Sequence, residues 1–144
     1  MAQKLILPIN KTRITAGYKN ANYRKEFGYN HYGVDYTDQQ KSDKTVWGSG
    51  EGVITHTGWS NSCGNVICAV YKNCQLTNGQ VKDLTIRYYH LEKIYVKAGD
   101  KITKDTRLGL YGNTGASTGD HLHIEIDTDT KYPNYTPQIG KNSG

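Results

Sequence analysis

Two histidines, His121 and His123, stand two residues apart in a stretch that could support metal or proton chemistry. From Leu122 to Ile126, apolar and polar residues alternate, which predicts a strand with one buried face. Side chains at positions i and i+2 of a strand point to the same face, with Cα atoms about 6.6 Å apart. The two imidazoles could therefore ligate one metal ion, or one could ligate it while the other handles a proton. The alternative is a polar strand face with two solvated imidazoles.

A second pair of candidate ligands, His31 and Asp35, is separated by three residues. In a straight strand the two would lie about 13 Å apart, too far to share a metal ion. A helix is disfavoured by Gly33 and Val34. A bend at Gly33, with Asp35 entering a strand, would bring the imidazole and the carboxylate together. The other interpretation is a buried Asp35 that caps a turn beside an exposed His31.

Short strands separated by turn signals would have to position these residues. The chain has 144 residues, enough for one domain with a real core. Asn78-Gly79 is a strong hairpin signal between two apolar runs. We find no amphipathic helix and no internal repeat. The strand candidates are residues 4–14 (broken at Pro8), 45–47, 52–57, 65–71, 84–90, 108–111 and 122–126.

This pattern predicts an all-β single domain. We expect an antiparallel sheet that forms the floor of a groove walled by loops, similar to a barrel-sandwich hybrid. Residues 1–130 would form the domain. Residues 131–144 lose the period and gather two prolines, so they are predicted to be a tail or the start of a linker.

The charge pattern narrows the class of partner. Eighteen basic and 13 acidic side chains give a net charge of +5, which favours an anionic partner. The basic residues are scattered, so we expect no nucleic-acid partner. No apolar run approaches the roughly 20 residues of a membrane span, and we expect no membrane contact.

The three cysteines, Cys63, Cys68 and Cys74, are predicted to be reduced. Their odd count argues against a full disulfide framework, and their spacing is poor for zinc. Cys68 falls inside an apolar run and is predicted to be a buried strand residue.

Three motifs in order resemble the lysostaphin-like M23 zinc metallopeptidases. The stretch Asn30-His-Tyr-Gly-Val-Asp-Tyr36 resembles the H-x-x-x-D motif of that family. Ser117 to Glu125 resembles its H-x-H motif, and Tyr89-His90-Leu91 falls where the family has an isolated histidine. Gly99 to Gly115 resembles the segment between these last two motifs. The resemblance covers roughly residues 8–126.

The resemblance implies a role for each of five residues. His31, Asp35 and His123 would be the ligands of one zinc ion, and His90 and His121 would be the catalytic imidazoles. Three protein ligands with one open position distinguish a catalytic zinc site from a structural one. No H-E-x-x-H helix is present, so a glutamate-based mechanism is not expected.

Several further residues are candidates for supporting roles. Family members use a tyrosine from the loop before the first motif to steady the tetrahedral intermediate, so Tyr23 or Tyr29 would bind substrate. Asp120 stands where many members carry proline, and would add negative charge beside the site. Glu125 is either a partner of a site histidine or a surface carboxylate. His56 matches no motif and is predicted to be an ordinary strand residue.

The resemblance implies a zinc endopeptidase that cleaves the peptide part of bacterial peptidoglycan at the cell wall. We expect a monomer. The N-terminus lacks the apolar core of a signal peptide, so we expect a phage-encoded lysin or the excised domain of a secreted protein. One rival is a catalytically silent relative that binds peptidoglycan or activates an amidase. The other rival is a biotinyl or lipoyl carrier domain, which needs a modifiable lysine at a hairpin tip between two methionines or similar residues. The only methionine here is Met1, so this class is disfavoured.

Overall fold

The computed structural model describes residues 2–9, 12–16, 34–38, 43–61, 63–115, 119–128 and 130. The candidates Tyr23, Tyr29 and His31 lie outside these residues, as does the segment 131–144. The strands are β1 Thr12–Ala16, β2 Val34–Asp38, β3 Thr45–Trp47, β4 Gly52–Ser60, β5 Gly64–Gln75, β6 Val81–Ile94, β7 Lys101–Ile102, β8 Arg107–Tyr111 and β9 Leu122–Asp127.

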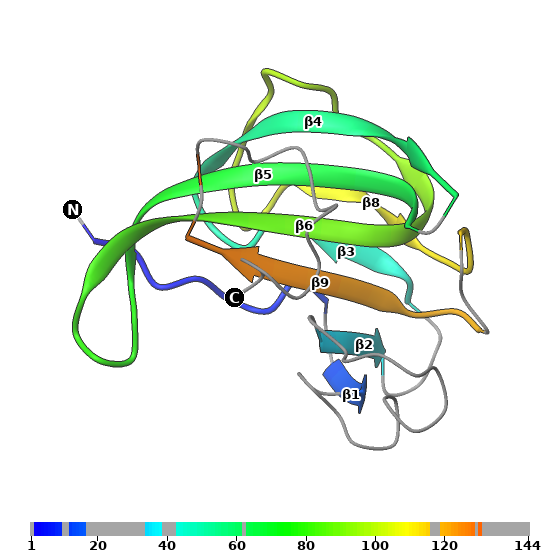
Figure 1. Cartoon of the computed structure of the whole chain (residues 1–144), viewed down its shortest axis with the longest axis horizontal. Helices are drawn as coiled ribbons and strands as arrows, with labels where there is room; N and C mark the ends of the chain where they lie inside the picture. The colour runs from blue at the N-terminus through cyan, green and yellow to red at the C-terminus, as the bar shows by residue number, and fades with distance from the viewer. Residues whose placement is uncertain are drawn as a thin grey trace.

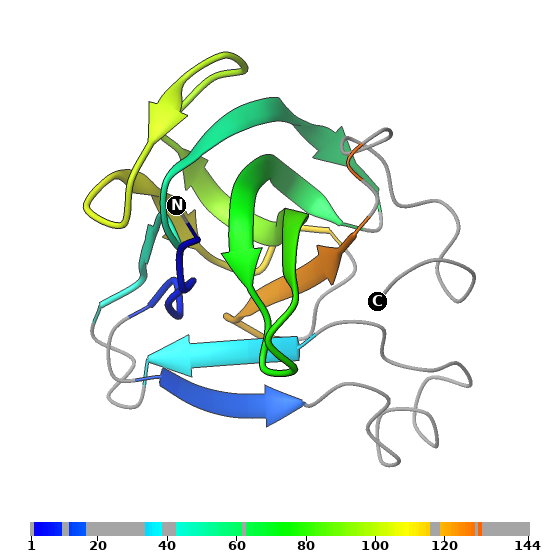
Figure 2. The ribbon, with the colours of Figure 1, turned by 90° about the vertical axis from the view of Figure 1, so that its left-hand side faces the viewer.

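These strands form one curled sheet in the order β1-β2-β9-β6-β5-β4-β7, with β8 joining β3 to β6 (Figures 1 and 2). Every strand pairing is antiparallel. No helix occurs among the described residues, so this part of the chain contains no helix that could cross a membrane. The expectation of an all-β single domain with an antiparallel sheet is confirmed.

The hairpin of β5 and β6 supplies the centre of the sheet. Its turn contains Gly79 at a φ of 87°, a left-handed conformation that glycine adopts without strain. One face of the hairpin carries Ile67, Tyr71 and Tyr88, which are fully buried in the main core. Removing a buried side chain such as that of Ile67 costs about 2–5 kcal/mol.

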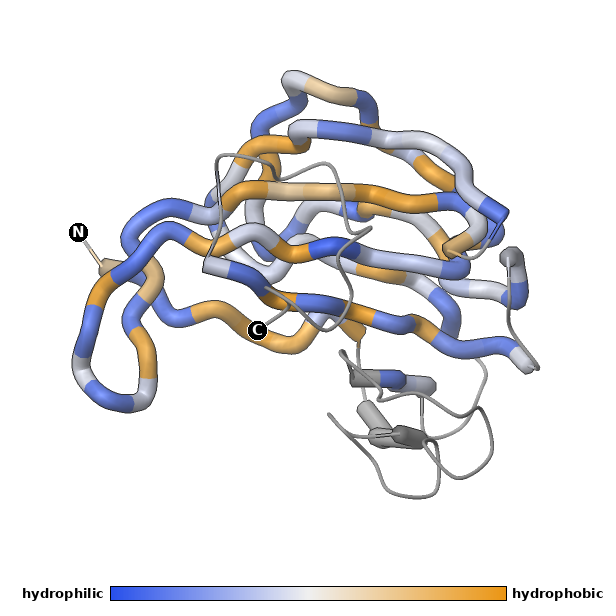
Figure 3. Tube along the Cα trace, viewed as in Figure 1, coloured by the Kyte–Doolittle hydropathy of each residue, from blue (hydrophilic) through white to orange (hydrophobic). Residues whose placement is uncertain are grey.

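The opposite face of the same strands carries a smaller apolar cluster of Val66, Cys68 and Tyr89, with the buried polar residues Thr85 and Arg87 on β6. Along β9 the apolar Leu122 and Ile124 enter the core, while His123 and Glu125 alternate with them. Figure 3 shows this alternation of hydrophobic and hydrophilic residues along β9. The predicted strand 122–126 is confirmed, and the face that carries His123 and Glu125 becomes the place to look for chemistry.

Other predicted boundaries were wrong, for identifiable reasons. The hairpin strands extend well beyond residues 65–71 and 84–90, because a two-stranded ribbon continues its ladder through exposed polar residues such as Lys82 opposite Cys74. β4 continues to Ser60, three residues beyond the predicted strand 52–57. Residues 4–9 form no strand, and the first strand lies at 12–16.

The three cysteines are free, as predicted, and Cys68 is fully buried in β5. The proposed domain boundary at residue 130 stays a prediction.

Candidate metal centre

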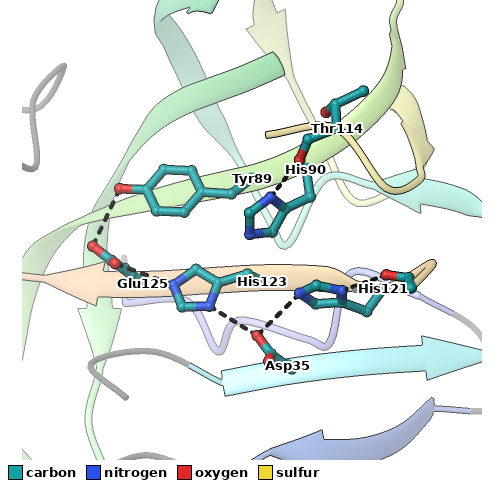
Figure 4. A network of polar contacts seen from close by, with 8 residues as sticks. Asp35, Tyr89, His90, Thr114, His121, His123 and Glu125 are labelled. Carbon is teal, nitrogen blue, oxygen red and sulfur yellow. Dashed lines mark hydrogen bonds and ion pairs between the residues drawn. The ribbon is translucent and has the colours of Figure 1, made fainter. Parts of the chain in front are cut away.

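Strand pairing brings the two predicted motifs together. β2 pairs with β9 so that Asp35 lies opposite His123, and β9 pairs with β6 so that His123 lies opposite Tyr89. Residues 88 positions apart in the sequence thereby become neighbours on one face of the sheet (Figure 4). The prediction that Asp35 enters a strand is confirmed.

The Asp35 carboxylate is the point on which two histidines converge. Its Oδ1 atom lies 2.8 Å from His123 Nδ1 and 3.6 Å from His121 Nε2. Asp35 and His123 are 7% and 8% exposed, and His121 is half-buried. The interpretation of two solvated imidazoles is therefore wrong for His123. The prediction that both histidines point to one face is confirmed.

His90 joins the site through an unusual backbone conformation. It has a φ of 64°, a left-handed conformation that costs a non-glycine residue about 1–3 kcal/mol. Strict alternation along β6 would place Tyr89 and His90 on opposite faces. The left-handed residue lets both rings reach the site, and the His90 ring lies 4.8 Å from that of His121 and 6.0 Å from that of His123.

Backbone carbonyls orient the two histidines that the resemblance names as catalytic. The His90 Nδ1–H donates to the Thr114 carbonyl at 2.6 Å, and the His121 Nδ1–H donates to the Gly119 carbonyl at 2.8 Å. In both rings, Nε2 is then the nitrogen that remains for chemistry in the site. Figure 4 shows the His121 Nε2 directed at Asp35.

The surroundings shift the pKa values of two histidines in opposite directions. Burial lowers the pKa of His90 to about 4, with a smaller lowering by His121 and His123 that the Thr114 hydrogen bond opposes. For His123, burial alone would lower the pKa, but hydrogen bonds to Asp35 and Glu125 outweigh burial and raise it to about 9. His90 is therefore neutral at pH 7, and His123 donates from both nitrogens in this structure.

The donor set suits zinc. Two ligands of a tetrahedral zinc ion, with bonds of about 2.1 Å, lie about 3.4 Å apart. Asp35 Oδ1 and His123 Nδ1, joined here by a proton at 2.8 Å, would have to separate by roughly half an ångström. Within the described part of the chain, no group of three or more histidine, cysteine or acidic residues is arranged to hold a metal ion. The third ligand that the resemblance names, His31, lies outside that part.

The site contains two residues whose roles the sequence left open or did not assign. Glu125 is only 3% exposed and contacts His123 Nε2 at 3.1 Å, so the surface-carboxylate interpretation is wrong. Tyr89 stacks on the His123 ring with a centroid distance of 5.1 Å. The alternation along β9 was the available signal, because it places Glu125 on the same face as His123.

Two other singled-out residues lie apart from this cluster of contacts. Asp120 is exposed and forms an ion pair with Lys44, just before His121. His56 lies in β4 opposite Cys68, as a partly buried strand residue.

A buried carboxylate and imidazoles, gathered here on one face of an all-β sheet, are the group types that hold a catalytic zinc ion. The family model of peptidase family M23 matches residues 29–135, and the chain belongs to that family. The expected family is thus confirmed.

Two curated relatives illustrate the similarity. The peptidoglycan DD-endopeptidase ShyA of Vibrio cholerae is 38% identical over 96 residues, covering 67% of this chain and 20% of ShyA. The glycyl-glycine endopeptidase ALE-1 of Staphylococcus capitis is 32% identical over 127 residues, covering 81% of this chain and 32% of ALE-1. The chain spans about a fifth to a third of these relatives.

Solved structures show the same fold. The catalytic domain of lysostaphin from Staphylococcus simulans superposes with a TM-score of 0.59 at 28% identity, covering 82% of this chain and 77% of that domain. A chain of the SpoIIQ–SpoIIIAH pore-forming complex gives a TM-score of 0.70 at 19% identity, covering 90% of this chain and 86% of that one. This second likeness shows the fold alone.

Proposed function

We propose that this chain is a zinc-dependent endopeptidase that hydrolyses peptide bonds in the stem or cross-bridge of bacterial peptidoglycan. The observation that carries the proposal is the convergence of His121 and His123 on the buried Asp35 carboxylate, with the His90 ring 4.8 Å from that of His121. Relatives whose names state peptidoglycan endopeptidase activity support the substrate class.

His31, Asp35 and His123 would hold the zinc ion. When bound, zinc acts as a Lewis acid towards a carbonyl oxygen and makes water a better nucleophile near neutral pH. Asp35 supplies the negative charge that such a site needs, and His123 presents Nδ1 towards it.

His90 and His121 would move protons through their Nε2 atoms. Both rings are fixed by Nδ1–H bonds to backbone carbonyls, so neither has to reorganise during the reaction. The two imidazoles would share the work: one takes a proton from the attacking water, and the other gives a proton to the leaving amine.

Tyr23 or Tyr29 would contribute a hydroxyl towards the tetrahedral intermediate, and Asp120 would contact substrate at the rim. The +5 charge suits a polyanionic cell wall, where we propose that the protein acts as a monomer. The relatives named above cleave different bonds, so fragment mass spectrometry on purified peptidoglycans of several chemotypes would identify the bond.

Two variants test the assignment. His121→Ala should keep about one zinc ion per chain and lose wall-lytic activity, whereas His123→Ala should lose both. Metal content is measured by mass spectrometry after purification without chelator, and lysis by the turbidity of a cell-wall suspension. Equal zinc retention in the two variants would contradict the division of roles, and zinc loss in His121→Ala alone would show that the roles are reversed. A wild-type chain that cannot be loaded with zinc would refute the enzyme assignment.

A catalytically silent binding or amidase-activating domain is the second candidate. The observation that favours it is the 2.8 Å contact between Asp35 Oδ1 and His123 Nδ1, which is shorter than the roughly 3.4 Å between two ligands of a tetrahedral zinc ion. A zinc-loaded chain that binds peptidoglycan but releases no fragments would establish this candidate instead.

A further inference from the structure

Glu125 is a buried carboxylate whose two oxygen atoms both have partners. Its Oε2 accepts a hydrogen bond from His123 Nε2–H at 3.1 Å, and its Oε1 accepts one from the Tyr89 hydroxyl at 3.2 Å. A buried carboxylate is costly unless it is paired and hydrogen-bonded. Glu125 is therefore held in one orientation, with one oxygen aimed at the outer nitrogen of the His123 ring (Figure 4).

Tyr89 contacts both members of this pair. Its ring stacks on the His123 ring at 5.1 Å with an interplanar angle of 6°, while its hydroxyl binds Glu125. Strand register explains the arrangement, because Tyr89 lies opposite His123 on the neighbouring strand. The stack restricts the tilt of the His123 ring, and the hydroxyl restricts the carboxylate.

A cation stands beside Glu125 on the same neighbouring strand. Arg87 lies opposite Glu125 in the register and pairs with Asp127 at 3.3 Å. Both members of this ion pair are buried. Arg87 thus places positive charge next to the Glu125 carboxylate.

These contacts decide which nitrogen of His123 carries the proton when the ring is neutral. A neutral imidazole carries its proton on one nitrogen and offers a lone pair at the other. When the His123 ring is neutral, as a metal ligand is, a carboxylate that accepts from Nε2–H keeps the proton there and leaves the Nδ1 lone pair available to a metal ion on the Asp35 side. Without Glu125, the proton could sit on Nδ1, where it would oppose a metal ion, and the ring would lose an anchor.

We propose that Glu125 is a positioning residue for the metal centre: it fixes the tautomer and ring orientation of His123, with Tyr89 as its support. This inference rests on the proposed zinc site and deepens it. Residues that hydrogen-bond to a metal ligand, rather than to the metal ion itself, typically contribute a factor of 10 to 100 in metal affinity.

The experiment measures zinc affinity by competition with a fluorescent chelator, on the full chain, for wild type and four variants. Glu125→Leu removes the acceptor at similar volume, Glu125→Gln keeps an acceptor oxygen without the charge, and Tyr89→Phe keeps the stack without the hydroxyl. Glu51→Gln is the matched control, because Glu51 is exposed and lies directly before β4, which is separated from β9 by β6 and β5 in the sheet. Thermal unfolding of the metal-free chains shows that each variant is folded.

We expect Glu125→Leu to weaken zinc binding about 10- to 100-fold, and Glu125→Gln to recover most of that loss. Tyr89→Phe should fall between wild type and Glu125→Leu, and Glu51→Gln should match wild type. Nitrogen-15 NMR of the zinc-loaded protein should show the His123 proton on Nε2 in wild type and in Glu125→Gln.

A folded Glu125→Leu variant with wild-type zinc affinity would overturn the proposal. Unchanged zinc affinity in Tyr89→Phe would refute the supporting role assigned to the Tyr89 hydroxyl. Failure of the wild-type chain to bind zinc would instead refute the proposed function, so the two failures are distinguishable.

Discussion

Asp35 and Asp127 offer a matched pair for testing whether ligation or local charge governs zinc binding. Both carboxylates are 7% exposed and both lie on neighbouring strands of the same sheet. Asp35 contacts His123 and His121, whereas Asp127 pairs with Arg87. Replacing either by asparagine removes one negative charge with almost no change in side-chain volume.

For Asp35→Asn we expect zinc affinity to fall by more than about 100-fold, because a direct ligand is lost. A factor of 100 is the upper limit expected for a residue that only hydrogen-bonds to a ligand. That factor corresponds to at least about 2.7 kcal/mol of binding free energy. The amide oxygen can still accept from His123 Nδ1–H. Replacing a charged by a neutral hydrogen bond should therefore lower the unfolding free energy of the metal-free chain by only about 1–1.5 kcal/mol.

For Asp127→Asn we expect the opposite pattern. Zinc affinity should stay within about threefold of wild type, since Asp127 pairs with Arg87 at 3.3 Å and is not among the residues that the resemblance names as ligands. Stability should fall more than in Asp35→Asn, towards the roughly 3–5 kcal/mol of a broken buried ion pair, because the buried Arg87 loses its countercharge.

Chelator competition measures the affinity, and urea unfolding of the metal-free chains measures stability. Equal losses of zinc affinity in the two variants would refute the reasoning. Such a result would mean that total charge on the sheet face, rather than ligation by Asp35, holds the metal ion.

Three further predictions concern other parts of the structure. His90→Ala should retain zinc and lose about 10²- to 10⁴-fold in kcat on cell walls, and loss of zinc would contradict its assignment as a proton carrier. Asp120→Ala removes the exposed ion pair with Lys44, so urea unfolding should detect less than about 1 kcal/mol of change, and a larger loss would give Asp120 a structural role. In the native chain, iodoacetamide should modify the half-buried Cys63 before Cys68, because burial raises the pKa of the Cys68 thiol to about 12; mass spectrometry showing the reverse order would contradict the buried placement.

The parts of the fold that follow from local sequence were predictable. The alternation along β9 predicts its strand and the shared face of His121 and His123, and Asn78-Gly79 predicts the central hairpin. Both signals depend on residues close together in the chain. The ends of β5 and β6 were not predictable in this way. Near the turn the two strands are extended by pairing with each other, and at the far end β6 is extended by pairing with β8.

The sequence by itself determined which chemical groups are available. It supplies the residue types, the spacing of His121 and His123 at the start of β9, and the motif resemblance that names the five residues His31, Asp35, His90, His121 and His123. Only the tertiary structure decided which of the described residues meet. Register sets Asp35 opposite His123, and a left-handed backbone turns His90 towards the same face. A hydrogen bond from the Tyr89 hydroxyl and one from His123 hold Glu125 as a buried partner rather than a surface carboxylate. The physical reason is that strand pairing joins residues far apart in the sequence, and local patterns carry no record of which strands become neighbours.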